Sequence, residues 1–208
     1  IVVESREPRS IRPNSLSSRP VNIDPTKLRV VHYPNPVLRQ KAVAIEANDL
    51  VRAVATRMIE LMRLEEGIGL AAPQVGLPWR LFVTHVPSSE KRSVGADPLQ
   101  ADADAMVYIN PVLSDPAGNL DPLEEGCLSL PDIRGVVNRP HEITIQALNE
   151  RGEPVQRRGA GLLARCWQHE LDHLDGVLIL DRMTQIYRIK NRSAVRDLEA
   201  EWDAAHGG

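Results

Sequence analysis

The stretch CWQHELDHLDG, residues 166–176, constrains this chain more than any other part of its sequence. His169 and His173 are four residues apart, so on a helix both imidazole rings project from one face and can bind one metal ion. Glu170 can then reach a water on that ion without binding the ion itself. The simpler alternative is a surface helix on which two histidines coincide. The position of a third ligand therefore decides whether this helix carries a metal site.

Known proteases with such a helix place their third ligand downstream of it. A metzincin-type protease has a third histidine three residues after Gly176, and Ile179 occupies that position here, so this class is excluded. A thermolysin-like protease takes a glutamate from a following helix. The nearest candidates, Glu199 and Glu201, lie late in a terminal helix and have the pattern of ordinary surface charge. Neither option supplies a convincing ligand.

A better candidate lies upstream, in the loop-like stretch EEGCLSLP, where Cys127 stands between Gly126 and Leu128. A thiolate and two imidazoles would bind the ion and leave one position open for water, as in catalytic sites. The alternative is a buried core thiol. Cys127 and Cys166 are the two cysteines, so a single disulfide also remains an alternative. A thiolate ligand would require a reducing compartment.

A third stretch, GIGLAAPQVG at residues 67–76, has glycines that let the backbone approach another group closely. Gln74 near its end has a side-chain amide that could donate to an oxyanion. Considered alone, this stretch is equally typical of a tight connection between a helix and a strand.

In this order, GIGLAAPQ, EGCLS and HELDH resemble the three motifs of the peptide deformylases, and the resemblance extends from about Leu28 through Met183. It implies one divalent metal ion per chain, with Fe²⁺ as the expected ion and Zn²⁺ or Ni²⁺ as substitutes in purified protein. The implied ligands are Cys127, His169 and His173. Glu170 would be the general acid and base, and the side chain of Gln74 and the backbone N–H of Leu128 would bind the oxyanion. Residues expected to contact or border the substrate are Ile68, Gly69, Glu125, Arg134, Leu162, Arg165 and Cys166.

The resemblance also implies an activity: hydrolytic removal of the formyl group from N-formylmethionine at the amino terminus of newly synthesised polypeptides, with release of formate. The expected partners are N-formylmethionyl nascent peptides, met transiently near the ribosome, and the expected state is a monomer. A net charge of -3 gives no reason to expect nucleic acid as substrate or an anionic membrane as partner.

Three rival hypotheses remain open from the residues. The first is an HExxH metallopeptidase that cuts internal peptide bonds. The second is a non-enzymatic metal-binding domain with a closed site, in which Cys166 would turn inward as a fourth ligand. The third is a deformylase-like fold without activity, against which the intact Gln74, Cys127 and Glu170 argue.

The pattern of elements predicts an α+β fold, with antiparallel or mixed sheets packed around the central helix that carries the histidines. Hydrophobic periodicity predicts helices over 48–66, 161–176 and 187–205, the last with a packing stripe of Val195, Leu198 and Trp202. Strands are expected over 28–34, 80–86, 106–113 and 143–147, with a turn at 34–36 and a hairpin turn at 149–152.

Residues 1–26 are rich in Arg, Ser and Pro and are expected to form a flexible extension before a single catalytic domain, residues 27–208. A similar composition is typical of organelle transit peptides. We expect a bacterial cytoplasmic location. The alternative is an organellar location, which this composition would fit. The polar insertion at 87–105 is expected to be a solvated loop. No apolar run approaches the ~20 residues that a membrane-spanning helix needs.

Overall fold

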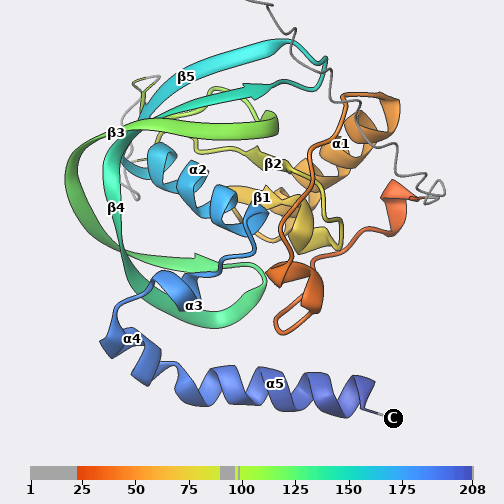
Figure 1. The fold of residues 1–208 in the computed structure, drawn as a ribbon, viewed down its shortest axis with the longest axis vertical. Helices are drawn as coiled ribbons and strands as arrows, with labels where there is room; N and C mark the ends of the chain where they lie inside the picture. Colours follow the sequence, from red (N-terminus) through yellow and green to blue (C-terminus); the bar gives the residue numbers. More distant parts are fainter. Residues whose placement is uncertain (1–22, 90–96, 98, 208) are drawn as a thin grey trace, which may run out of the picture.

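The computed structural model describes residues 23–89, 97 and 99–207, and one antiparallel sheet within them wraps around a central helix (Figure 1). The five strands in this part of the chain follow one another in sequence order across the sheet. They are β1 (Gly69–Ala71), β2 (Leu81–Thr84), β3 (Met106–Cys127), β4 (Leu130–Leu148) and β5 (Pro154–Ala160). The helices are α1 (Asp49–Leu64), α2 (Gly161–Leu174), α3 (Ile179–Arg182), α4 (Gln185–Lys190) and α5 (Arg192–His206), with short 3₁₀ helices η1 (Pro25–Lys27), η2 (Pro36–Arg39) and η3 (Ala72–Val75). The predicted α+β class is confirmed.

The long hairpin of β3 and β4 curves around α2, as Figure 1 shows. Its register shifts between Ile109 and Val112, and again after Ser114. Pro111 and Pro116 fall within these two shifts, where the absence of a proline N–H breaks no ladder hydrogen bond. Such irregularities bend a strand, and here they let the hairpin enclose the helix.

The sequence predicted only the beginning of β3. The strand expected over 106–113 continues to Cys127, because pairing with β4 orders a stretch that is mostly exposed and lacks apolar alternation. The segment 124–131, expected as a loop, is the end of β3 and a tight turn, with Cys127 opposite Leu130. The strand expected at 143–147 is the second half of β4, and the hairpin turn at 149–152 is confirmed by the pairing of Leu148 with Pro154.

The two long inner helices form where their periodicity predicts. Helix α1 buries Val54, Met58 and Met62 on one face, and the Asn48 side chain caps its first turn by accepting from the Val51 N–H at 3.0 Å. Helix α2 buries Trp167 completely, in a cluster between the sheet strands. Burial of these apolar faces stabilises the helices far more than their intrinsic propensity does.

The prediction of a strand over 28–34 is wrong, because these residues form no strand in the structure. A turn is present at Tyr33–Pro34. This segment lies across the ends of two elements instead of along one strand. Its Val31 N–H donates to the Gln74 carbonyl at 2.8 Å, and its Tyr33 N–H donates to the Ser129 carbonyl at 2.9 Å. The segment therefore connects η3 with the β3–β4 turn, which both contribute to the site described below.

The expected terminal helix is two helices, α4 and α5, which meet at Asn191. Figure 1 shows α5 along one side of the molecule, away from α2. Val195 and Leu198 pack partly buried against the cluster around Leu38, as predicted, whereas Trp202 stacks on His206 of the same helix at 3.7 Å between ring centroids.

Two predictions concern residues that the structure describes only in part. Of the extension at 1–26, residues 1–22 lie outside the described part, so the predicted domain boundary stays a prediction. Of the insertion at 87–105, residues 90–96 and 98 also lie outside it, but its end is not a solvated loop, because Ala101 and Asp102 are buried. No helix among the described residues is long and apolar enough to cross a membrane.

Candidate metal centre and its cavity

Helix α2 places the two histidines of HELDH side by side. Gly161 begins the helix with a positive φ of 58°, which glycine adopts without strain. Further along the helix, Trp167 packs so closely on β5 that a Cβ at Gly159 would lie 2.5 Å from its ring. Because Trp167 anchors one face of the helix, His169 and His173 project from another, with ring centroids 5.0 Å apart and nearly perpendicular planes at 71°.

The turn between β3 and β4 brings Cys127 to these histidines. One ligand atom from each of Cys127, His169 and His173 lies within 4.8 Å of the others, and the Cys127 Sγ is 3.2 Å from the His173 Nε2. The Nδ1 of His169 is bonded to Glu125 at 3.0 Å, which leaves its Nε2 available. A thiolate with two imidazoles suits a transition-metal ion, and no fourth protein ligand joins this cluster among the described residues. The donor set therefore fits an ion with an open position.

A buried network of charges holds His169 in place. Arg139 donates to both oxygens of Glu125, at 2.7 and 2.9 Å, and also to Asp172 at 2.9 Å. Arg165 donates to the same carboxylate at 2.7 Å. Burial alone would raise the pKa of Glu125, but the hydrogen bonds from His169 and Arg139 lower it well below its usual range. Glu125 is thus a buried carboxylate that orients the His169 ring.

Glu170 lies beside the cluster with an uncommitted oxygen. Its side chain is 4 % exposed, and its Oε2 has no hydrogen-bond partner among the described residues. Burial raises the pKa of Glu170 to about 7, the range suited to accepting and returning a proton near neutral pH. An added Cβ at Gly69 would lie only 2.3 Å from the Glu170 Oε1, so β1 passes directly against this carboxylate.

Gln74 is buried on the other side of the cluster. Its Oε1 accepts from the Ala71 N–H at 2.8 Å, and this bond turns the amide nitrogen toward the Cys127 Sγ at 3.5 Å and the Ser129 Oγ at 3.4 Å. Leu128 follows Cys127 in the β3–β4 turn and lines the same cavity. Two candidate oxyanion donors therefore flank the Cys127 sulfur.

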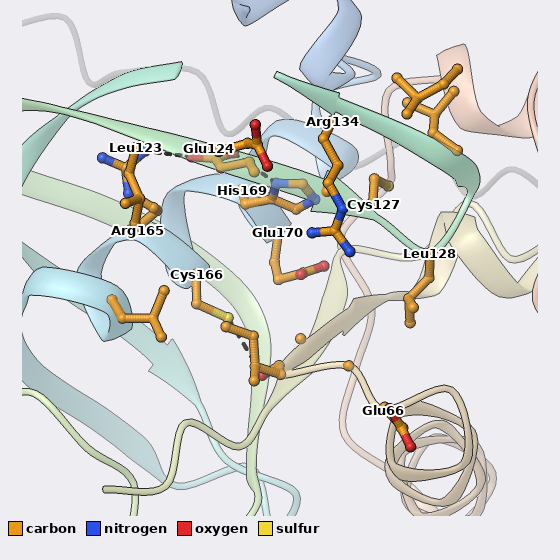
Figure 2. Close-up of a pocket in the computed structure, with 18 of the residues that line it drawn as sticks. Glu66, Leu123, Glu124, Cys127, Leu128, Arg134, Arg165, Cys166, His169 and Glu170 are labelled. Atoms are coloured by element: carbon orange, nitrogen blue, oxygen red, sulfur yellow. Dashed lines mark hydrogen bonds and ion pairs between the residues drawn. The ribbon is translucent and has the colours of Figure 1, made fainter. Parts of the chain in front are cut away.

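One cavity of about 1260 Å³, seen in close-up in Figure 2, is lined by Gln74, Cys127, Leu128, His169 and Glu170. Of the lining residues labelled in Figure 2, Arg134 is exposed and Cys127 partly exposed, whereas Arg165 and Cys166 on α2 are buried. Every residue expected to contact or border the substrate is in the cavity wall: Ile68, Gly69, Glu125, Arg134, Leu162, Arg165 and Cys166. Glu125 and Arg165 line it while their charges are paired with each other.

The residues considered as rival ligands lie elsewhere. Glu199 accepts from the Tyr33 hydroxyl at 2.7 Å, and neither it nor Glu201 belongs to the metal cluster. Cys127 and Cys166 are free thiols, so the disulfide alternative is wrong. The Cys166 sulfur points to the Ile68 carbonyl at 3.5 Å, and burial raises the pKa of this thiol well above its ordinary value. Cys166 is accordingly no fourth ligand.

Sequence reasoning missed Arg139, which pairs with Asp172 as well as with Glu125. The side chain of Asp172 is only 13 % exposed and pairs with Arg139 and Arg182. Arg139 occupies an inward position of β4, between Asn138 and Pro140, where an alternating pattern would place an apolar residue. A charged residue at an inward strand position is the one sign in the sequence that Arg139 has buried partners. It does not show which residues these partners are.

The fold and this centre define a class, that of α+β proteins in which two histidines of a helix inside a curved sheet meet a cysteine at the end of one of its strands. A family model described as polypeptide deformylase matches residues 27–188. A peptide deformylase of Opitutus terrae is 42% identical over 174 residues, covering 81% of this chain and 88% of that protein. One of Maricaulis maris is 35% identical over 175 residues, covering 84% and 95%.

Comparison with solved structures points to the same family. A plant peptide deformylase superposes with a TM-score of 0.77 at 35% identity, covering 88% of this chain and 95% of that one. A peptide deformylase from Ehrlichia chaffeensis gives a TM-score of 0.74 at 30% identity, covering 86% and 98%. The chain belongs to the peptide deformylase family, whose members are metal-dependent amide hydrolases.

Proposed function

We propose that this chain removes the formyl group from N-formylmethionine at the amino terminus of newly synthesised polypeptides and releases formate. The observation that carries the proposal is the cluster of Cys127, His169 and His173 beside a cavity that Glu170 also lines, with a Glu170 oxygen that has no partner among the described residues. Hydrolysis of a formyl amide needs an activated water and a stabilised oxyanion. The cavity offers groups for both.

Cys127, His169 and His173 would hold one divalent ion, with Fe²⁺ as the proposed physiological ion and Zn²⁺ or Ni²⁺ as substitutes. An ion bound there supplies a Lewis acid that lowers the pKa of a water molecule and polarises the formyl carbonyl. The thiolate of Cys127 favours a softer ion than a carboxylate would. Glu125 keeps the His169 ring oriented through its Nδ1.

The chain's own groups then move the proton and hold the developing charge. Glu170 accepts the proton of the attacking water at its free Oε2 and returns it to the nitrogen of the departing amine. The amide of Gln74 and the backbone N–H of Leu128 donate to the oxyanion formed on the formyl oxygen. Loss of one such donor raises a barrier by about 3 kcal/mol, so Gln74 should matter nearly as much as a ligand.

The cavity wall supports a preference for methionine after the formyl group. An apolar surface for the methionine side chain is formed by Ile68 together with Leu162 and Cys166 of α2. Gly69 offers its backbone to the peptide. Arg134 is exposed near the mouth, where it can approach the downstream peptide. The close packing of Glu170 against Gly69 leaves little room around the reacting carbon. We expect this site to admit a formyl hydrogen and to reject an acetyl methyl group.

The test measures formate release from formyl-Met-Ala-Ser by protein that is purified anaerobically in the presence of ferrous iron. We expect rapid release from this peptide and none from acetyl-Met-Ala-Ser, and the Glu170→Gln variant is the matched control for contaminating activity. Bound metal without formate release would refute the proposal. Cleavage of internal peptide bonds would instead favour a metallopeptidase, which nothing in the site favours at present.

Partners and location extend the proposal. The proposed substrate class would bring the chain near ribosomes while peptides are being made. We propose a bacterial cytoplasmic location, in line with the relatives from Opitutus terrae and Maricaulis maris, with an organellar location as the alternative. Residues 27–208 would form the single catalytic domain, as a monomer. Size-exclusion chromatography coupled to light scattering tests the monomer, and a dimer mass would contradict it.

A further inference from the structure

Ser129 ends the EGCLS stretch, and the proposed chemistry gives it no role. It lies in the turn between β3 and β4 and is fully buried. Its neighbours Leu128 and Leu130 line the cavity, whereas Ser129 is not among the lining residues. A buried hydroxyl group needs a hydrogen-bond partner. The partner of Ser129 is Gln74, one of the two candidate oxyanion donors.

The side-chain amide of Gln74 has one orientation that satisfies its neighbours. Its Oε1 accepts from the Ala71 N–H at 2.8 Å, and only the oxygen of an amide group can accept. The amide nitrogen, with two hydrogens, lies 3.4 Å from the Ser129 Oγ and 3.5 Å from the Cys127 Sγ. Because an amide nitrogen only donates, the Ser129 hydroxyl is the acceptor of one of these hydrogens.

The two hydrogens of the Gln74 amide point to different surroundings. Cys127 lines the cavity, and its sulfur is one of the three candidate ligand atoms. The hydrogen directed at Cys127 is therefore on the cavity side, where the formyl oxygen of a substrate would arrive. Ser129 is fully buried, so the other hydrogen is directed into the protein. Neither substrate nor solvent competes for the contact between Gln74 and Ser129.

The backbones of Gln74 and Ser129 are held by the same segment of the chain. The Val31 N–H donates to the Gln74 carbonyl at 2.8 Å, and the Tyr33 N–H donates to the Ser129 carbonyl at 2.9 Å. Since Val31 and Tyr33 are only two positions apart, these bonds fix the two carbonyl groups relative to each other. Ser129 is thus a firmly held support for the Gln74 side chain, as a residue that orients a catalytic group must be.

We propose that Ser129 is a positioning residue for oxyanion binding: its hydroxyl accepts one hydrogen of the Gln74 amide and so keeps the other directed at the formyl oxygen in the transition state. This rests on the proposed function. Without the hydroxyl, the amide is held through Oε1 alone and is free to tilt. A donor stabilises a transition state most when it is oriented before the charge develops. Loss of the hydroxyl should therefore lower kcat and leave KM unchanged.

The test is a double-mutant cycle on formate release from formyl-Met-Ala-Ser. In otherwise wild-type protein, Ser129→Ala should lower kcat about threefold to tenfold, the range of one hydrogen bond, at unchanged KM. The Gln74→Ala variant should itself be about 100-fold slower. Adding Ser129→Ala to it should cause no further loss, because no amide remains to be oriented. The bound metal content should be equal in all four proteins.

Thr144→Val is the matched control for removal of a buried hydroxyl. Thr144 is 6 % exposed, its hydroxyl accepts from the Arg158 guanidinium at 3.3 Å, and it is not among the residues that line the cavity. This variant should keep the wild-type kcat and KM. Ser129→Gly also lacks the hydroxyl and suits a turn, so it guards against a folding defect in Ser129→Ala.

The outcomes separate the positioning role from a structural one. An equal loss of kcat in the wild-type and Gln74→Ala backgrounds would overturn the inference, because Ser129 would then support the fold without acting through Gln74. An unchanged kcat in both Ser129 variants, or a rise in KM alone, would overturn it as well. A wild type that binds metal but releases no formate would overturn the proposed function itself, which is a different result from an active wild type with an unaffected Ser129 variant.

Discussion

At the scale of single residues, Gly69 is where one added methyl group should have the largest effect. A Cβ there would lie 2.3 Å from the Glu170 Oε1 and 2.8 Å from the Cys166 Sγ. We expect Gly69→Ala to displace the Glu170 carboxylate and to lower kcat by about 100-fold, because misplacement of a reacting group by about 1 Å has effects of this size. Formate release and metal content measure this, and near-normal turnover with a full complement of metal would contradict it.

Glu170 gives a second prediction at this scale. Burial raises the pKa of its carboxyl group to about 7, and one oxygen has no partner among the described residues. Glu170→Gln keeps the shape and removes a buried charge. It should lower kcat by at least about 100-fold while the melting temperature stays equal or rises. A melting temperature several degrees below that of the wild type would show that Glu170 has a structural role instead.

At the scale of elements, α2 depends on the β3–β4 hairpin through Arg139. This side chain is buried at 5 % exposure and bridges Glu125 of β3 to Asp172 of α2. In Arg139→Met both carboxylates lose their main buried cation, which typically destabilises a protein by about 3–5 kcal/mol. Because Glu125 would then orient His169 less well, metal affinity should fall by about 10-fold or more. Urea unfolding and a metal competition assay measure the two effects separately.

The control for Arg139 lies in the same network. Arg182 pairs with Asp172 as well, but half of its side chain is exposed. Exposed ion pairs contribute at most about 1 kcal/mol, so Arg182→Met should leave both stability and metal affinity almost unchanged. Equal effects of the two variants would contradict the view that the inner part of the network supports the metal centre.

At the scale of the whole molecule, three apolar clusters hold the fold, and the candidate metal centre lies against them. They surround Trp167, Met58 and Leu38 respectively. We therefore expect a chelator to abolish formate release without unfolding the chain, and Fe²⁺ added back to restore activity. Loss of a ligand that binds only the native state at 100 times its Kd removes about 2.7 kcal/mol of stability, so the melting temperature should fall by about 5–10 °C. Far-ultraviolet circular dichroism characteristic of an unfolded chain after chelation would contradict this expectation.

Elements with local signals could be predicted from the sequence. The cap at Asn48 and the spacing of Val54 and Met58 define α1, and the spacing of His169 and His173 defines the working face of α2. The three motifs also contained every residue of the candidate metal cluster. The helix signals depend on residues within a few positions of one another, where helical geometry relates spacing directly to direction. Cys127, 46 residues before His173, was linked to the histidines only by the family resemblance.

The other features depend on contacts between residues that are far apart in the chain, so the sequence pattern could not predict them. The outer part of β3 has no apolar alternation and is ordered by pairing with β4. Arg139 is charged at an inward position, and its burial is intelligible only beside Glu125 and Asp172, 14 and 33 residues away. The end of the polar insertion is buried at Asp102, whose carboxylate accepts from Thr84 and Arg157, 18 and 55 residues away. A sequence pattern predicts which face of a helix or strand a residue occupies. Which buried charges pair is fixed only when elements that are distant in the chain pack against each other.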